Sequence, residues 1–107
     1  MRSIDICNLI SYTLGVIKSF RDKGLEDFFY DGSKRGIQAD HVKKLRLILD
    51  RLHSAMRIND MNYPGSKLHS LQGTLKGHWA VTVSGNWRVT FQFKSGDAFV
   101  VDYQDYH

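Results

Sequence analysis

The sequence predicts an α+β domain in which two N-terminal helices pack on one face of a mostly antiparallel sheet. In the first half of the chain, apolar residues recur at intervals of three and four, whereas in the second half they alternate with polar residues. The two patterns meet at the turn-rich stretch 59–66, which contains the single proline, Pro64. Helices that come first and strands that come last are typical of an α+β fold, because alternating elements would instead build a parallel sheet.

Two segments show helical spacing. The segment 25–29 carries apolar residues at intervals of three and four before Gly32, which predicts a short helix that ends at this glycine. Asp40 can accept a backbone hydrogen bond as the N-cap of a second, longer helix. The apolar face of the second helix is expected to hold Val42, Leu45, Ile48, Leu49, Leu52 and Met56.

The alternating pattern predicts three strands. Residues 79–83 and 87–93 alternate apolar with polar side chains, which indicates a hairpin with its turn at Ser84-Gly85. A second turn at Ser95-Gly96 leads into a third strand at 98–103. The resulting meander has one apolar face, on which the helices can pack, and one polar face, which is not needed for packing of the helices.

Two further segments, 16–20 and 67–71, are expected to form additional short strands. The 107 residues are close to the length of one domain, so residues 16–107 are expected to form a single domain. Residues 1–15 have no place in this arrangement and are interpreted as an N-terminal extension of uncertain role.

Composition narrows the class of protein. An apolar share of 42% is typical of a folded chain, and 15 Lys and Arg against 11 Asp and Glu give a charge of +4, which weakly favours polyanionic partners. The single cysteine, Cys7, excludes an intramolecular disulfide and fits a reducing compartment. No apolar run is long enough to span a membrane, and polar residues interrupt the first 17 positions, so we expect a cytoplasmic protein without membrane contact.

Acid–base and phosphate-binding groups gather in the second half of the chain. Arg88 stands on the polar side of its strand, where its guanidinium could bind a phosphate through two hydrogen bonds. His69 and the terminal residues Asp105-Tyr106-His107 supply imidazoles and a carboxylate, which suit proton transfer near neutral pH. The competing interpretation is an ordinary exposed arginine, an unrelated histidine and a frayed tail.

Two histidines and one carboxylate could also hold a metal ion as a facial triad. We rank this below metal-free chemistry, because the histidines lack the tight helical spacing of many metal sites. Of the other histidines, His41 and His53 are expected on the helix surface and His78 at the start of a strand.

Separated motifs along residues 16–107 carry a family resemblance. They are Ile17-Lys18-Ser19-Phe20, Lys67-Leu68-His69, Gly77-His78-Trp79, Gly85-Asn86-Trp87-Arg88-Val89-Thr90-Phe91 and Asp102-Tyr103-Gln104-Asp105-Tyr106-His107. In this order they resemble the HigB toxins, or plasmid maintenance killer proteins, of the RelE-like family in type II toxin–antitoxin systems. The resemblance implies a RelE-like fold and a ribosome-dependent endoribonuclease that cuts translated mRNA without a cofactor. It also implies a HigA-type antitoxin, through whose complex alone operator DNA is bound.

The resemblance also implies roles for individual residues. Its cleavage positions correspond to His69, Arg88, Asp105, Tyr106 and His107, with Asn86 in support. Three further residues, Lys67, Gln72 and Lys76, are expected to bind RNA. Relatives commonly carry a lysine three residues after the histidine, where this chain has Gln72, so one phosphate-binding charge is missing unless Lys67 or Lys76 replaces it. Relatives also begin near Val16, which suggests that residues 1–15 arise from a misassigned start; activity and thermal melting of a chain beginning at residue 16 would test this.

The alternative to an enzyme is a non-catalytic basic domain that binds RNA or an acidic protein. In that case Arg88, Trp79 and Trp87 would form a contact surface. Both tryptophans are instead expected in the core, because each alternates in phase with apolar neighbours on its strand.

Overall fold

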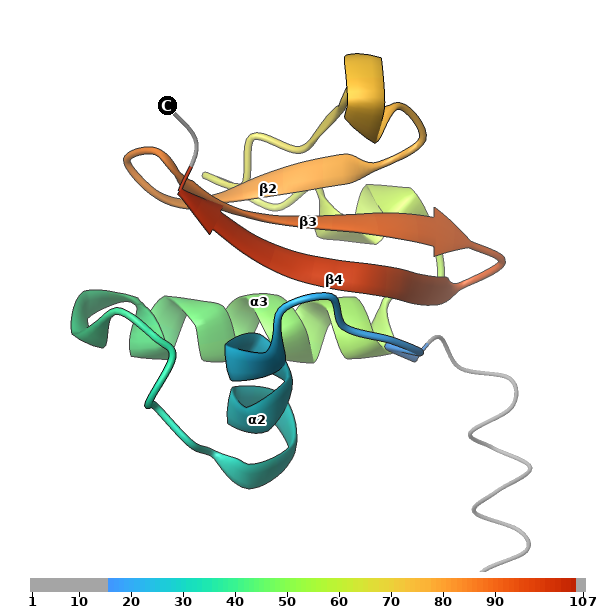
Figure 1. Ribbon diagram of the computed structural model, residues 1–107. Helices are drawn as coiled ribbons and strands as arrows, with labels where there is room; N and C mark the ends of the chain where they lie inside the picture. Colours follow the sequence, from blue (N-terminus) through green and yellow to red (C-terminus); the bar gives the residue numbers. More distant parts are fainter. Residues whose placement is uncertain (1–15, 106–107) are drawn as a thin grey trace, which may run out of the picture.

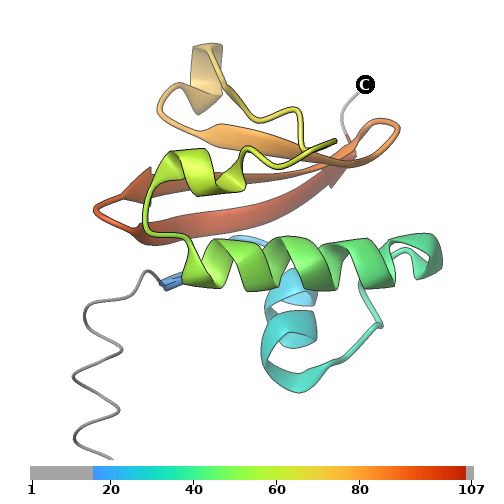
Figure 2. The ribbon, with the colours of Figure 1, turned by 180° about the vertical axis from the view of Figure 1, so that it is seen from behind.

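Two helices pack on one face of a four-stranded antiparallel sheet (Figures 1 and 2). The computed structural model describes residues 16–105. The α-helices are α2 (Lys23–Asp31) and α3 (Val42–Ser54), and the 3₁₀ helices are η1 (Ala39–His41), η2 (Ile58–Met61) and η3 (Gly73–Leu75). The strands follow in spatial order as β1 (His69–Ser70), β2 (Trp79–Ser84), β3 (Trp87–Lys94) and β4 (Asp97–Asp105). The predicted α+β arrangement is confirmed. Within residues 16–105, none of the helices is long and apolar enough to cross a membrane.

Helix α2 ends at Gly32, as the sequence predicts, and it begins at Lys23, two residues before the predicted apolar segment. The Asp22 carboxylate accepts a hydrogen bond from the Leu25 N–H at 2.8 Å and caps the first turn. Gly32 follows the last turn with a φ of +76°, a left-handed conformation that glycine adopts without steric strain. Leu25 and Phe28 are buried, so this short helix is held mainly by its apolar side.

Helix α3 is shorter at both ends than the sequence predicts. Asp40 lies within η1 rather than at the N-cap, which is His41, so the predicted cap is wrong. The reason is that residues 39–41 already form a tighter 3₁₀ turn ahead of the helix. Ala55 is extended and ends the helix, so Met56 lies outside its apolar face and is 56% exposed.

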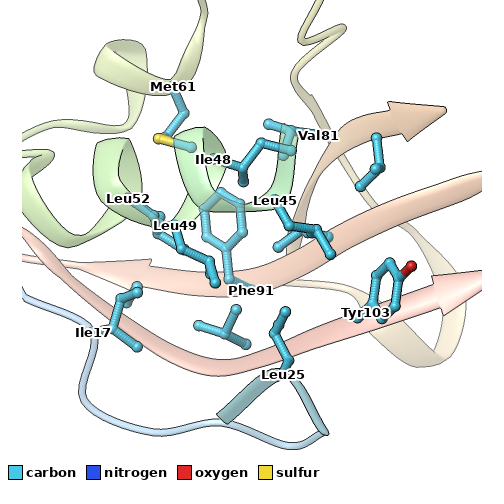
Figure 3. Packing of buried hydrophobic residues seen from close by; sticks show 14 of the residues in the cluster. Ile17, Leu25, Leu45, Ile48, Leu49, Leu52, Met61, Val81, Phe91 and Tyr103 are labelled. Carbon is cyan, nitrogen blue, oxygen red and sulfur yellow. The ribbon is translucent and has the colours of Figure 1, made fainter. Parts of the chain in front are cut away.

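The core lies between α3 and the sheet (Figure 3). Helix α3 contributes Leu45, Ile48, Leu49 and Leu52, and the facing strands contribute Val81, Val89, Phe91, Val101 and Tyr103. Met61 from η2 and Ile17 from the N-terminal segment complete its edges. Trp79 and Trp87 are half-buried and pack against this core, in the direction that their alternation predicts.

Both hairpin turns use the left-handed backbone that tight turns demand. Gly85 opens the β2–β3 turn with a φ of +56°, and Ser95 and Gly96 turn β3 into β4 with φ values of +52° and +84°. The two successive positive φ values of Ser95 and Gly96 are the signature of a type I′ turn, whose twist matches that of the flanking strands. The predicted turn at Ser95-Gly96 is confirmed, whereas the β2–β3 turn consists of Gly85 and Asn86, one residue later than predicted, because Ser84 still belongs to β2.

The segment 16–20 does not form the expected strand. It runs parallel to β4 and makes isolated bridges from Ile17 to Ala98 and from Phe20 to Val101. Between the bridges, β4 carries an extra residue, Val100, with a φ of +47° that is unusual for a β-branched side chain. The Val100 N–H therefore donates to the Ser19 hydroxyl at 2.8 Å instead of continuing a regular ladder.

The expected strand at 67–71 shortens to the two residues of β1. Lys67 has a φ of +51°, which an extended strand cannot contain. After β1, the chain leads into η3, which lies on the far side of the sheet from the α-helices (Figure 1). The polar face of the sheet is consequently not open throughout, and Thr90 in the middle of it is only 1% exposed.

The start of α2 touches the loop that follows it, backbone against backbone. A Cβ added to Gly36 would lie 2.9 Å from the Cα of Gly24, closer than real Cβ atoms come. We expect Gly36→Ala to lower the free energy of unfolding by about 1–3 kcal/mol, because two backbone segments must separate. Urea denaturation would measure this against Lys34→Ala, an exposed change in the same loop; equal stability of the two variants would contradict the close contact.

Candidate active site

The face of the sheet that points away from α2 and α3 carries two rows of residues. One row, running from β2 through β3 to β4, contains Thr82, Arg88 and Gln104. The next row contains His69, Ala80, Thr90 and Asp102. Residues two positions apart on a strand share a face, so His69 and Arg88 lie on the same side of the sheet. They are separated by two strand spacings and two residues along the strand, so their Cα atoms are about 12 Å apart.

The tautomer of His69 follows from its hydrogen bond. Its Nδ1 lies 2.8 Å from the carbonyl oxygen of Lys67, and a carbonyl oxygen only accepts hydrogen bonds. Nδ1 therefore carries a hydrogen, and in the neutral ring Nε2 is the nitrogen with the lone pair. The side chain is exposed at the edge of the sheet, where Nε2 can reach a bound molecule.

Arg88 borders a pocket of about 430 Å³ on the same face. Leu71 and Gln72, together with η3 (Gly73–Leu75), form the rest of its wall. Arg88 is half-buried, so its guanidinium is partly shielded from water, where hydrogen bonds to an anion are stronger. The structure thus brings Arg88 and Gln72, both predicted from the sequence, to one pocket.

Three other predicted residues are exposed on the segments that precede or follow these elements. Lys67 and Lys76 are exposed on either side of the β1–η3 segment. Asn86 is exposed in the β2–β3 turn, and the register pairs its neighbour Trp87 with Asp105 at the end of β4. The turn and the end of β4 therefore lie side by side (Figure 1).

Asp105 lies on a different face from Arg88. It follows Gln104 directly, so the alternation of β4 puts it on the side of Tyr103 and the α-helices. Tyr106 and His107 lie outside the described residues, so the structure does not test their predicted positions or the metal triad that includes His107. Within residues 16–105, no group of three or more His, Cys, Asp or Glu is placed to hold a metal ion.

A hydrogen-bonded network beside Arg88 was not singled out from the sequence. The Gln104 side-chain amide donates to the Asp102 carboxylate at 2.9 Å and to the Thr90 hydroxyl at 3.3 Å. The Tyr103 N–H also donates to Asp102, at 2.9 Å. The available signal was the polar alternation of β3 and β4, which puts these side chains on the face of Arg88 once the register is known.

His41 is buried rather than on the helix surface, and its predicted position is wrong. It is 6% exposed, and its Nδ1 lies 2.7 Å from the hydroxyl oxygen of Tyr103. The Gln38 N–H donates to the same oxygen at 3.3 Å. Burial raises the pKa of the Tyr103 hydroxyl, so this group remains protonated and ties the end of β4 to η1. The prediction failed because it considered only the helix, whereas a tertiary contact between η1 and β4 buries His41.

A carboxyl group near the Gln104 network is also perturbed. Burial raises the pKa of Asp22, and the negative charge of Asp102 adds to the rise, whereas the hydrogen bond from the Leu25 N–H opposes it. The N-cap of α2 and the network on β4 are therefore close enough to interact electrostatically.

Comparison with known proteins identifies the family of this site. Residues 18–107 match the family described as the RelE-like toxin of type II toxin-antitoxin system HigB. The chain belongs to this family. It is 42% identical over 92 residues to Endoribonuclease HigB of Proteus vulgaris, an alignment that covers 86% of this chain and 100% of that protein. It is 31% identical over 81 residues to Toxin HigB-1 of Vibrio cholerae serotype O1, covering 74% of this chain and 85% of that protein.

The HigB family match confirms the RelE-like fold and the toxin class that the sequence motifs predicted. The expected enzyme class agrees with the name of the Proteus vulgaris relative. The match begins at Lys18 and therefore includes all of the strands and both α-helices described above.

Proposed function

We propose that this HigB-family chain is a ribosome-dependent endoribonuclease that cuts translated mRNA by metal-free acid–base chemistry. The observation that carries the proposal is the common sheet face shared by His69 and Arg88. A proton-transfer group and a phosphate-binding cation on one face are what cleavage of an RNA backbone requires. The family membership and the enzyme name of a relative support the same reaction class.

The proposed reaction transfers the RNA phosphate to its own neighbouring 2′-hydroxyl. The 2′-oxygen attacks phosphorus, the bond from phosphorus to the 5′-oxygen breaks, and the products are a 2′,3′-cyclic phosphate and a free 5′-hydroxyl. One group removes the proton of the 2′-hydroxyl and another protonates the departing 5′-oxygen. The Arg88 guanidinium stabilises the negative charge that develops on the phosphate oxygens in between.

The proton carriers in this proposal are His69 and His107. His69 acts through Nε2, because its Nδ1 hydrogen is held by the Lys67 carbonyl. Asp105 orients an imidazole, and Tyr106 packs on a base or donates to the phosphate. Asn86, exposed in the adjacent turn, supports the RNA near this end of the sheet.

Binding of the RNA backbone is assigned to three side chains on the segment that runs from Lys67 to Lys76. Lys67 and Lys76 are exposed and supply positive charge, which attracts phosphates. Gln72 lines the pocket beside Arg88 and offers hydrogen bonds without charge. This set carries two positive charges and one neutral amide, whereas a lysine at position 72 would have added a third positive charge.

The proposal includes a partner and a place in the cell. Membership of a type II toxin–antitoxin family implies an antitoxin, which we propose is of the HigA type. Operator DNA would be bound only through the complex with that antitoxin. The protein would act in the cytoplasm, where ribosomes and messenger RNA are found.

Cleavage mapping on purified ribosomes tests the function. The chain is incubated with a defined messenger in three states: free, bound to idle ribosomes, and under translation. We expect cuts only within translated codons, with cyclic-phosphate ends, and their loss in His69→Ala. Intact RNA in all three states would instead favour the non-catalytic binding domain, and loss of cutting on addition of a chelator would favour a metal-dependent enzyme.

A further inference from the structure

The chain just ahead of β1 pairs irregularly with β2. The register of β1 pairs His69 with Ala80, so a regular antiparallel ladder would place Lys67 opposite Thr82. The Thr82 N–H instead donates to the carbonyl oxygen of Ser66, at 2.8 Å. One extra residue therefore lies between the two points at which this segment is bonded to β2, which is the defining feature of a β-bulge.

The bulge removes the Lys67 carbonyl from the ladder. Lys67 has a φ of +51°, a left-handed conformation that is uncommon for residues other than glycine. Its carbonyl oxygen lies 2.8 Å from Nδ1 of His69, and this nitrogen must carry the hydrogen of the bond. In a regular strand the carbonyl groups lie in the plane of the sheet and the side chains stand perpendicular to it. An extended Lys67 would therefore offer its carbonyl to β2 rather than to the imidazole.

The left-handed turn at Lys67 is held from both sides. Ser66 is 0% exposed, its N–H donates to the Tyr63 carbonyl at 3.0 Å, and its own carbonyl accepts from β2. On the other side, the pairing of His69 with Ala80 fixes the start of β1. An uncommon backbone conformation persists where its surroundings determine it in this way, and such conformations are frequent at functional sites.

We propose that Lys67 is a positioning residue for His69 and acts through its backbone carbonyl, in addition to the charge of its side chain. The inference rests on the proposed function, in which His69 transfers a proton during RNA cleavage. The carbonyl keeps a hydrogen on Nδ1 and orients the ring, so that Nε2 is always the nitrogen presented to the RNA. The carbonyl itself touches no reacting atom.

The first test compares Lys67→Gly with Lys67→Val in RNA cleavage on translating ribosomes. Both variants lack the ammonium group, so both should show a higher KM because RNA binding is weaker. Glycine adopts a φ of +51° without steric cost, whereas a β-branched residue is an outlier there. We expect kcat to be about 10-fold lower in Lys67→Val than in Lys67→Gly, because valine disfavours the turn that supplies the carbonyl. Equal kcat values for the two variants would overturn the proposal.

Ser95 offers a matched control for backbone strain. It has a φ of +52° and is exposed in the β3–β4 turn, five residues beyond Thr90, which lies in the row of His69. Ser95→Val and Ser95→Gly should therefore differ in melting temperature but not in kcat. If the Ser95 pair differs in kcat as much as the Lys67 pair, the effect is a general loss of stability and the Lys67 carbonyl has no special role.

The tautomer of His69 can be measured without RNA. Long-range ¹H–¹⁵N correlation spectra show which ring nitrogen carries the hydrogen, at a pH above the range in which imidazoles titrate, and His69→Gln assigns the signals. We expect the hydrogen on Nδ1 in the parent and in Lys67→Gly, and a larger share on Nε2 in Lys67→Val. A parent ring with its hydrogen mainly on Nε2 would refute the inference even if RNA is cut. The expected tautomers in a protein that cuts no RNA would refute the proposed function alone.

Discussion

Arg88→Ala is expected to lower kcat for RNA cleavage by about 100- to 1000-fold, the usual cost of removing one preorganised donor from a developing negative charge. Arg88 borders the pocket on the face away from α2 and α3, and its partly buried position strengthens its interaction with phosphate. Single-turnover cleavage on translating ribosomes would measure the loss separately from product release.

Two controls make this result specific to the site. Lys94→Ala removes one positive charge from the exposed end of the same strand, and we expect it to retain most of the activity. Thermal melting must show that Arg88→Ala is still folded, because its side chain also fills part of the sheet face. If Lys94→Ala loses as much activity as Arg88→Ala, the effect is one of overall charge and Arg88 has no special role.

The layers of this fold could be predicted because they follow from short-range patterns. The alternation through Val81 and Val89 and the helical spacing through Leu45 and Leu49 place these residues in the core, as the structure confirms. The β3–β4 turn could also be placed, because Ser95-Gly96 lies between two alternating runs and suits a left-handed backbone. Where local preference and tertiary packing agree, the sequence alone is sufficient to predict the position of an element and the residues that it buries.

The errors occur where contacts distant in sequence override local preference. Asp40 is a good N-cap by residue type, but the chain forms η1 there so that His41 can reach Tyr103, 62 residues away. Likewise, the segment around Ser19 looks like a strand, yet the extra residue Val100 in β4 interrupts its pairing. Neither interaction leaves a periodic signal that could be found from local sequence.

The candidate site could be predicted from the sequence to the same extent as the fold: its local features could be predicted, but its contacts between strands could not. Alternation alone put Arg88 on the polar face, and strand pairing then brings His69 to that face. The network around Gln104 needed the register between β3 and β4, which the bulge at Val100 shifts by one residue. Asp105 could not be assigned to a face from the motif, because side-chain direction depends on where β4 ends.

The largest expected change in stability comes from Phe91→Ala. Phe91 is 0% exposed and points from the middle of β3 into the side chains of α3 (Figure 3). Its removal leaves a cavity that the helix and sheet cannot close together, so we expect the free energy of unfolding to fall by about 3–5 kcal/mol. That is a large part of the roughly 5–15 kcal/mol by which small domains are stable.

For a domain of this size, such a loss corresponds to a melting temperature lower by roughly 15–30 °C. Phe93→Ala is the matched control, because Phe93 lies on the same side of the same strand but is only half-buried. Chemical denaturation of both variants should show the larger loss for Phe91, since only its ring is enclosed on all sides. If Phe93→Ala is at least as destabilising, the core is centred closer to the β3–β4 turn than the packing around α3 indicates. Cleavage by Phe91→Ala, measured well below its melting temperature, should stay near that of the parent, because Phe91 and Arg88 lie on opposite faces of β3.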